Sequence, residues 1–188
     1  MMLLILGGAR SGKSTYAERK AHELSDEIGT HVLYIATALA FDEDMKDRIK
    51  KHQAARPAHW HTVEQFKDFT SLANQEAFKQ SQVILLDCMT LMVSNLLLQY
   101  EVDFDQVNRA VIDEIECNII KEVEALLRIC KQYCKQLIVV SNEVGLGIVP
   151  AYRLGNIFRD IAGRINQCLA KEAEQVFFLV SGLPLQIK

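Results

Sequence analysis

Gly7-Gly8-Ala9-Arg10-Ser11-Gly12-Lys13-Ser14 is the stretch that decides the fold. It matches the phosphate-loop pattern G-x-x-x-x-G-K-[ST] at every fixed position. An apolar run at residues 3–6 precedes it, and a helical pattern over residues 13–28 follows it. A strand, a glycine-rich turn and a helix in this order form the context in which the motif binds nucleotide phosphates. The sequence therefore predicts a site for a nucleoside triphosphate.

Phosphate binding requires the residue types of this loop. Glycines allow a tight turn in which successive backbone N–H groups face the phosphate oxygens, and the following helix adds the positive end of its dipole. We expect the Lys13 ammonium to lie between the β- and γ-phosphates and the Ser14 hydroxyl to ligate Mg²⁺. The residues predicted to contact the nucleotide here are Gly7, Gly8, Ala9, Arg10, Ser11, Gly12, Lys13 and Ser14.

A second magnesium ligand is expected at the end of another buried strand. Asp87 follows the apolar residues 83–86, and in a parallel sheet this position lies at the carboxyl edge, where ligands gather. In phosphate-loop proteins the carboxylate that ligates Mg²⁺ usually comes from a strand next to the one that precedes the loop. We predict that Asp87 has this role and ligates Mg²⁺ directly or through water. Aspartate is also a favoured helix N-cap, and a capping role of Asp87 stays open at this point.

Short apolar segments alternate with helical patterns along the whole chain. The predicted strands are residues 3–6, 31–36, 83–87, 137–141 and 176–180. The predicted helices are residues 13–28, 42–54, 66–79, 90–100, 105–134 and 153–173. Continuous apolar runs are typical of parallel strands that are covered on both faces. The pattern predicts an α/β fold with a doubly wound sheet, and the prolines (Pro57, Pro150 and Pro184) are expected between elements.

Length and charge limit the classes of protein. The chain has 188 residues, so we expect a single domain over 1–188. A hydrophobic content of 49% is that of a globular protein rather than a disordered one. A net charge of −3 provides no overall positive field, which argues against nucleic acid as a partner. The apolar run at residues 1–6 is too short for a signal peptide or a membrane span, so we expect a cytoplasmic protein.

The five cysteines are expected to be reduced and buried. Their odd number and the lack of a C-x-x-C pair argue against a disulfide framework. Cys130 and Cys134 lie one helical turn apart and could ligate a metal, but neither a second pair nor a histidine cluster accompanies them.

His52 is a candidate nucleophile. It lies in a segment, residues 42–53, that begins acidic and ends basic, as suits a helix dipole. Imidazole is a nucleophile at neutral pH and forms a reactive phosphoramidate, which suits nucleotidyl transfer. From the spacing alone a partly buried structural histidine is the more common case, and His59 and His61 compete for the role. A rigid basic loop over residues 56–60, which ends in Trp60, is expected to approach an anionic ligand.

Six motifs occur together in one order along the chain. They are G-G-A-R-S-G-K-S at 7–14, Y-I-A-T at 34–37, R-I-x-x-H at 48–52, R-P-x-x-W at 56–60, N-E-V-G-x-G-I-V-P at 142–150 and F-R-D-x-A-G-R-x-N-Q at 158–167. With them the chain, from residue 2 to about 188, resembles the bifunctional adenosylcobinamide kinase / adenosylcobinamide-phosphate guanylyltransferase family of cobalamin synthesis. The phosphate loop is generic, whereas the last two motifs are highly specific. The resemblance implies a P-loop (RecA-like) α/β fold, a mostly parallel sheet with helices on both faces, and a homotrimer.

The resemblance also implies two activities. ATP or GTP first phosphorylates the aminopropanol hydroxyl of adenosylcobinamide. GTP then guanylylates His52 with release of pyrophosphate, and GMP passes to adenosylcobinamide phosphate to give adenosylcobinamide-GDP. Some relatives carry two adjacent histidines where this chain has Lys51-His52, so His52 alone can serve. The further nucleotide contacts that the resemblance implies are Thr37, Ala38, Leu39, Gln53, Ala54, Ala55, Arg56, Glu64 and Asp87.

Several roles stay open at this point. Glu143, before a turn that contains Gly145 and Gly147, could bind the corrinoid side chain or a metal-bound water, or could belong to a purely structural loop. A helix near the C-terminus carries four polar residues that could belong to the site or could equally form a subunit interface: Arg159, Asp160, Arg164 and Asn166. Two alternative functions are a P-loop small-molecule kinase without a covalent intermediate and a nucleotide-dependent switch that acts on a partner protein.

Overall fold

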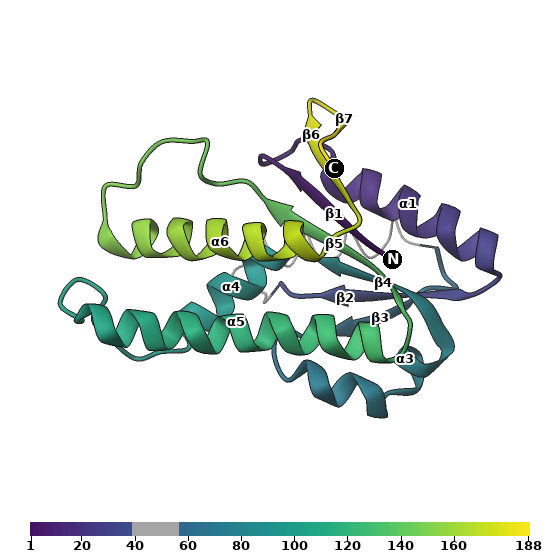
Figure 1. Ribbon diagram of the computed structural model, residues 1–188, viewed down its shortest axis with the longest axis horizontal. Helices are drawn as coiled ribbons and strands as arrows, with labels where there is room; N and C mark the ends of the chain where they lie inside the picture. The colour runs from purple at the N-terminus through teal and green to yellow at the C-terminus, as the bar shows by residue number, and fades with distance from the viewer. Residues whose placement is uncertain (39–56) are drawn as a thin grey trace.

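The computed structural model describes residues 1–38 and 57–188. A seven-stranded sheet runs through this part of the chain, with the strand order β3-β2-β4-β5-β1-β6-β7 (Figure 1). The strands are β1 (Met2–Gly7), β2 (His31–Ala36), β3 (His61–Glu64), β4 (Ser81–Asp87), β5 (Gln136–Asn142), β6 (Gln175–Val180) and β7 (Leu183–Gln186). Strands β1 to β6 are parallel, and β7 pairs antiparallel with β6. The predicted mostly parallel α/β sheet is confirmed.

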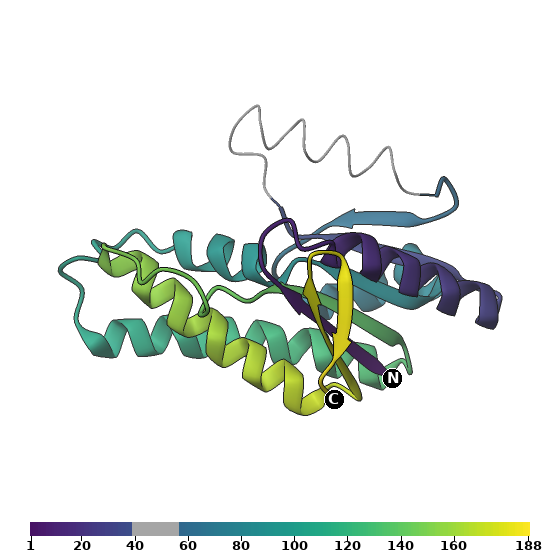
Figure 2. The same ribbon diagram turned by 90° about the horizontal axis from the view of Figure 1, so that it is seen from above.

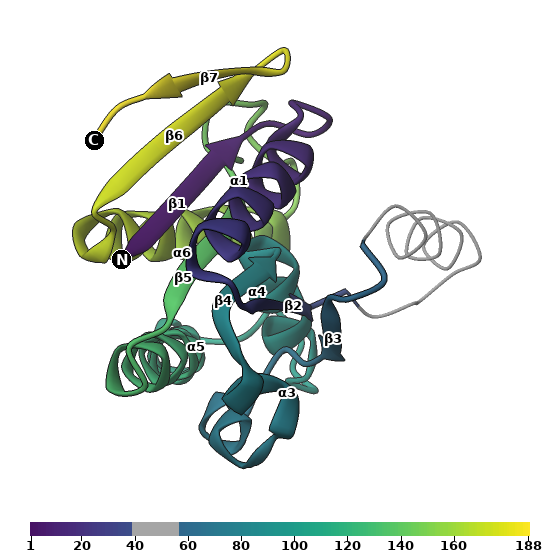
Figure 3. The same ribbon diagram turned by 90° about the vertical axis from the view of Figure 1, so that its right-hand side faces the viewer.

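Helices cover both faces of this sheet. They are α1 (Lys13–Ile28), the 3₁₀ segment η1 (Phe69–Asn74), α3 (Glu76–Gln80), α4 (Met89–Leu98), α5 (Arg109–Gln132) and α6 (Arg153–Glu172). Helix α1 packs on one face, and α4, α5 and α6 pack on the other (Figures 2 and 3). Side chains alternate along a strand, so Leu3 and Ile5 of β1 face α1, whereas Leu4 and Leu6 face the opposite layer. The sequence of a strand that is covered on both faces is therefore a continuous apolar run.

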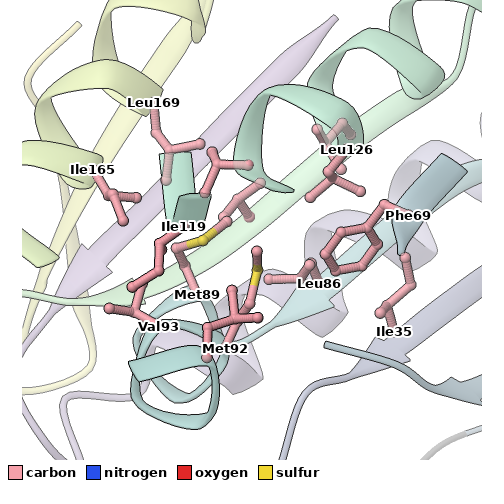
Figure 4. Close-up of a cluster of buried hydrophobic side chains, with 14 of the residues drawn as sticks. Ile35, Phe69, Leu86, Met89, Met92, Val93, Ile119, Leu126, Ile165 and Leu169 are labelled. Carbon is pink, nitrogen blue, oxygen red and sulfur yellow. The ribbon is translucent and has the colours of Figure 1, made fainter. Parts of the chain in front are cut away.

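The larger core lies under α4, α5 and α6. Met89 and Met92 of α4 are fully buried there, together with Leu86 of β4 and Ile119 of α5 (Figure 4). Burying each such side chain stabilises the fold by roughly 1.5–3 kcal/mol. Because α4 begins two residues after Asp87, this packing also fixes the end of β4.

Residues 66–79 do not form the single helix that the sequence predicts. They divide into η1 and α3, because Gln75 between them is extended, with φ −87° and ψ 130°. Asp68 takes the left-handed conformation, with φ 55°, and the Gln65 side-chain amide donates to the Asp68 carbonyl oxygen at 2.8 Å. Local hydrogen bonds of this kind compete with helix formation. The helix predicted over 42–54 lies outside the described residues.

Strands β3 and β7 are not predicted by the sequence pattern. Both have four residues, and β7 is exposed along its whole length, so neither shows a continuous apolar run. The expectation that every proline lies between elements is wrong for Pro184, which lies within β7. Proline lacks an N–H to donate to a ladder, and the edge strand of a sheet is the position that tolerates it.

All five cysteines are free, but only some are buried. Cys88 and Cys130 are buried as expected, whereas the expectation is wrong for three exposed thiols, Cys117, Cys134 and Cys168. Two of these lie on α5 and α6, which each bury one face and leave the other in water. Within the described ranges, no helix is long and apolar enough to cross a membrane.

The topology brings the carboxyl ends of the parallel strands to one edge of the sheet. The chain leaves β1 through α1 to reach β2 on one side of it, and leaves β5 through α6 to reach β6 on the other. In open α/β sheets the ligand site lies beyond the strand ends at the point where the strand order reverses. The phosphate loop follows β1 at this point.

Candidate active site

The phosphate loop forms the turn between β1 and α1. Gly12 takes the left-handed conformation, with φ 88°, and α1 begins at Lys13 with no side-chain cap and no acidic residue in its first turn. The amino end of α1 therefore presents backbone N–H groups and the positive end of its dipole to an anion. Lys13 is buried, and its Nζ donates to the Gly8 carbonyl oxygen at 2.8 Å. This hydrogen bond holds the ammonium group against the loop.

Gly7 lies in a space too tight for a side chain. A Cβ at this position would lie 2.5 Å from Ser11 Oγ and 2.8 Å from the Leu179 carbonyl oxygen. Ser11 Oγ is buried and has no hydrogen-bond partner among the described residues. A buried hydroxyl without a partner costs free energy, so this loop suits a ligand that brings acceptor oxygens, as a phosphate does.

The β6–β7 hairpin supports the loop. The Gly182 N–H donates to the Ser11 carbonyl oxygen at 2.9 Å, and a Cβ on Gly12 would lie 3.1 Å from the Gly182 Cα. Ser181 and Gly182 have φ values of 50° and 85°, as in a type I′ hairpin turn. Sequence reasoning missed this contact, although the Ser-Gly dipeptide between two apolar segments was a turn signal.

Asp87 ends β4, where Tyr34 Oη donates to its Oδ2 at 2.8 Å. The expectation of a neighbouring strand is wrong, because β5 lies between β4 and β1. Two strand spacings place Asp87 about 10 Å across the sheet from the strand that carries the loop. The capping alternative is also wrong, since Cys88 rather than Asp87 is the N-cap of α4.

Lys13 and Asp87 act electrostatically on the same buried thiol. Burial raises the pKa of Cys88, the negative charge of Asp87 raises it further, and the positive charge of Lys13 lowers it. The loop cation and the strand-end carboxylate therefore both influence Cys88, which follows directly after β4. A magnesium-bound nucleoside triphosphate needs both a cation and a carboxylate at its site.

A buried polar network connects the ends of β2 and β4. Thr37 Oγ1 donates to the Cys88 carbonyl oxygen at 2.8 Å and accepts from the Cys88 N–H at 2.9 Å. Asn95 Nδ2 of α4 donates to the Thr37 carbonyl oxygen at 2.6 Å, and the Asp87–Cys88 peptide bond is cis. The Thr37 side chain therefore ties the two strand ends together. A contact between Thr37 and nucleotide stays a prediction.

Asn142 and Glu143 lie directly beside the phosphate loop. Asn142 pairs in register with Gly7, the last residue of β1. The Glu143 N–H donates to the Gly7 carbonyl oxygen at 3.1 Å, and Glu143 Oε1 accepts from the Gly145 N–H at 2.9 Å. The turn predicted around residues 145–147 is confirmed, and it is exposed.

The sequence left the roles of several α6 residues open, and two of these residues form side-chain interactions within this chain. Arg164 forms a bidentate ion pair with Glu116 of α5. Asn166 is buried, and its Nδ2 donates to the Asn142 carbonyl oxygen at 3.1 Å. These side chains fix α6 against α5 and against the end of β5.

The four described histidines lie away from the phosphate loop. His31 begins β2 and His61 lies at the start of β3, and their ring centroids are 5.4 Å apart. Strand β3 is also four strand spacings, about 19 Å, across the sheet from β1. His59 lies against His22, with 6.4 Å between ring centroids, and His22 is nine residues, about 13 Å, along α1 from Lys13. Neither His59 nor His61 therefore lies at the loop.

Most of the described residues that the sequence predicts as ligands gather at one edge. The carboxyl ends of β1, β2 and β4 carry the eight loop residues, Thr37 with Ala38, and Asp87, respectively. Glu64 ends β3 at the same edge but is exposed and lies two strands beyond Asp87. Trp60, expected in a loop that approaches an anion, is instead buried in the core against α1, because its large apolar ring packs there. Six predicted residues lie outside the described ranges: Leu39, His52, Gln53, Ala54, Ala55 and Arg56.

Comparison with known proteins shows the family to which the chain belongs. The family model described as cobinamide kinase / cobinamide phosphate guanyltransferase matches residues 3–187, nearly the whole chain. The chain belongs to this family. The bifunctional adenosylcobalamin biosynthesis protein CobU of Escherichia coli is 43% identical over 188 residues, with 100% of both chains covered. The CobP protein of the same description from Pseudomonas aeruginosa is 43% identical over 185 residues, with 98% of this chain and 96% of its own covered.

Among solved structures, the flagellar accessory protein FlaH from Methanocaldococcus jannaschii has a similar fold. It superposes with a TM-score of 0.50 at 17% identity and covers 100% of this chain and 77% of its own. At this identity the likeness concerns the fold alone. Together with the mostly parallel seven-stranded sheet, this likeness confirms the predicted P-loop (RecA-like) fold class.

Proposed function

We propose that this protein phosphorylates adenosylcobinamide with ATP or GTP and then transfers GMP from GTP, through a guanylylated His52, to adenosylcobinamide phosphate. The products of the second reaction are adenosylcobinamide-GDP and pyrophosphate. Membership of a family described by these two activities supports both steps. The structural observation that carries the proposal is the phosphate loop, with Lys13 held against Gly8 at the sheet edge where Asp87 also lies.

Ser14 and Asp87 are the residues proposed to hold Mg²⁺. A hydroxyl and a carboxylate are oxygen donors of the kind that this ion prefers, and they lie in the first turn of α1 and at the end of β4, so the donor set fits. When bound, Mg²⁺ supplies positive charge that offsets the negative charge of the triphosphate. The hydrogen bond from Tyr34 Oη to Asp87 Oδ2 orients the carboxylate for this role.

The positions of the other histidines support His52 as the nucleophile. The chain has five histidines, and the four described ones lie along α1, near the starts of β2 and β3, or beside His22, rather than at the loop. His52 is thus the histidine that remains for covalent chemistry at this site. Its attack on the α-phosphorus of GTP would form a phosphoramidate and break the bond to pyrophosphate.

Lys13 is proposed to serve both reactions. In the kinase step the substrate hydroxyl attacks the γ-phosphorus and a nucleoside diphosphate leaves, whereas in the second step pyrophosphate leaves. Both leaving groups gain negative charge, which Lys13 and the loop N–H groups stabilise. A phosphate oxygen of adenosylcobinamide phosphate then attacks the phosphoramidate, forms the diphosphate bond and restores the imidazole of His52.

Labelling with GTP that carries radioactive phosphorus in its α-phosphate tests the nucleophile. His52→Ala should lose the label on the protein and still phosphorylate adenosylcobinamide, whereas Lys13→Ala should lose both activities. His59→Ala is the matched control, because it removes an imidazole that lies beside His22 and away from the loop. Label that persists in His52→Ala would contradict this assignment.

The same assay separates the alternative functions. A phosphoramidate is labile in acid and stable in base, so the label should be lost on acid treatment. A protein that phosphorylates the corrinoid but never carries label is a simple P-loop kinase. A protein that binds GTP tightly and does not turn over with adenosylcobinamide is a nucleotide-dependent switch.

We also propose that the protein is a homotrimer, on the strength of the family resemblance. Large apolar side chains stand exposed in the segment after β5, and surface of this kind often marks an interaction site. They are Leu146, Ile148, Val149 and Tyr152. Light scattering should give three times the chain mass of 21.3 kDa, and a monomeric mass would contradict the trimer. The cytoplasmic location stays a prediction.

A further inference from the structure

We propose that Glu143 is the catalytic base of the kinase step: its carboxylate accepts the proton of the adenosylcobinamide hydroxyl that attacks the γ-phosphorus. This inference rests on the kinase function proposed above. Phosphoryl transfer to an alcohol needs an acceptor for the hydroxyl proton, and a carboxylate commonly has this role. In the described part of the chain, three carboxylates end or directly follow a parallel strand at the edge that carries the loop: Glu64, Asp87 and Glu143.

Position across the sheet separates these three carboxylates. Glu64 ends β3, about 19 Å from β1, and Asp87 ends β4, about 10 Å from β1. Asp87 is also engaged by Tyr34 Oη at 2.8 Å. Glu143 follows β5, which pairs directly with β1, and its backbone N–H donates to the Gly7 carbonyl oxygen at 3.1 Å. Glu143 is therefore the strand-end carboxylate that lies beside the phosphate loop.

Position along the strands favours Glu143 as well. Asp87 pairs in register with Val140, whereas Asn142 pairs with Gly7. Glu143 thus lies three residues, about 10 Å, further beyond the sheet edge than Asp87. The Gly7 carbonyl oxygen accepts from the Glu143 N–H, and the carbonyl oxygen of the next loop residue, Gly8, accepts from Lys13 Nζ at 2.8 Å. The Glu143 carboxylate and the Lys13 ammonium, which serves the terminal phosphates, therefore both belong to residues that lie beyond the strand ends.

The Glu143 carboxylate is oriented and accessible. Its Oε1 accepts from the Gly145 N–H at 2.9 Å, which limits the rotation of the side chain. The following residues, 145–149, are exposed, so a large acceptor can approach Glu143 from solvent. Glu143 forms no ion pair with any residue in the described part of the chain, so its negative charge stays available for a proton.

The step balances in atoms and charge. The hydroxyl O–H bond breaks as the proton passes to Glu143, and the alcohol oxygen forms a bond to the γ-phosphorus. The bond from the γ-phosphorus to the β–γ bridging oxygen breaks, and the nucleoside diphosphate leaves with the electron pair. Glu143 then releases its proton to solvent. Guanylylation of His52 involves no alcohol proton, because an imidazole nitrogen attacks with its lone pair, so Glu143 serves one of the two activities.

Glu143→Gln tests the proposal with little structural change. Glutamine keeps an acceptor oxygen for the Gly145 N–H and nearly the same volume, but it cannot accept the proton. The kinase rate should fall about 100-fold or more, which is the range for loss of a general base. Labelling of His52 by GTP should stay within about twofold of wild type, because that step does not use the base. Glu172→Gln, an exposed residue at the far end of α6, is the matched control.

The label also counts functional sites, so kinase rates are expressed per labelled site even when part of a variant is unfolded. Glu143→Asp keeps a base one methylene further away and should retain more kinase activity than Glu143→Gln. A normal kinase rate in Glu143→Gln would overturn the proposal. Equal loss of kinase activity and labelling would overturn it too, since Glu143 would then serve nucleotide binding or the fold. A wild-type protein that never phosphorylates adenosylcobinamide would refute the proposed function instead.

Discussion

Alanine in place of Gly7 should destabilise the protein, whereas alanine in place of the adjacent Gly8 should not. Both residues begin the phosphate loop, and both changes add one methyl group. The difference lies in the surroundings, because Gly7 is buried between the loop and β6 and Gly8 is exposed. Comparison of the two variants therefore separates the effect of tight packing on stability from the general effect of losing a glycine.

The distances at Gly7 set the magnitude. Ordinary contacts begin at 3.4 Å, so the new Cβ would be 0.9 Å too close to Ser11 Oγ and 0.6 Å too close to the Leu179 carbonyl oxygen. The Ser11 hydroxyl can rotate away, but Leu179 pairs in register with Gly7 in the sheet and cannot. Overpacking of this kind costs about 1–3 kcal/mol. At Gly8 no described atom lies within 4 Å of the new Cβ, and alanine there should be neutral or stabilise by up to about 1 kcal/mol.

Thermal unfolding without nucleotide measures the difference, since a bound phosphate would stabilise both variants. For a chain of this length 1 kcal/mol shifts Tm by about 2–4 °C, so a cost of about 1–3 kcal/mol should make Gly7→Ala unfold roughly 2–12 °C below wild type. Gly8→Ala should match wild type or exceed it slightly. Equal Tm values for the two variants would refute the packing argument.

Two further predictions concern the surroundings of the site. Tyr34→Phe removes the hydrogen bond to Asp87 Oδ2 at 2.8 Å, so the Mg²⁺ concentration for half-maximal activity should rise about 2–10-fold; an unchanged requirement would contradict the positioning role. Burial raises the pKa of Cys130 to about 12, so almost none of it is thiolate at neutral pH and alkylation should be slow in the folded protein. Mass spectrometry after brief alkylation should find the exposed thiols modified, namely Cys117, Cys134 and Cys168, and rapid modification of Cys130 would show that its site opens.

The phosphate loop and the five apolar strands were predictable because their signals are local. Residues 7–14 carry the glycines, the lysine and the serine within a single turn, and the context of strand and helix is adjacent in sequence. The strands over residues 31–36 and 83–87 lie between two covering layers, so each reads as one continuous apolar run. Helix α1 agrees with its prediction at both ends, because Gly12 and Gly29 flank it in left-handed conformations.

The sequence predictions that were wrong or missing have a different cause. Residues 66–79 have an apolar pattern that suits a helix, but an extended Gln75 and the local hydrogen bonds of Gln65 divide the segment. Trp60 follows basic and proline residues that suggested a loop near an anion, yet it is buried against α1. Strand β7 is exposed and exists only through its pairing with β6. In each case a specific contact that the apolar pattern does not encode decided the outcome.

The sequence by itself determined that a triphosphate loop follows the first strand, that the sheet is mostly parallel, and which family the motifs resemble. It could not determine the order of the strands, since apolar runs of similar composition can pair in many ways at similar local energy. That order places β5 between β1 and β4, so it moves Asp87 away from the loop and brings Glu143 beside it. It also carries His59 and His61 away from the loop. Proximity of this kind arises from long-range packing and strand pairing, which only the folded chain specifies.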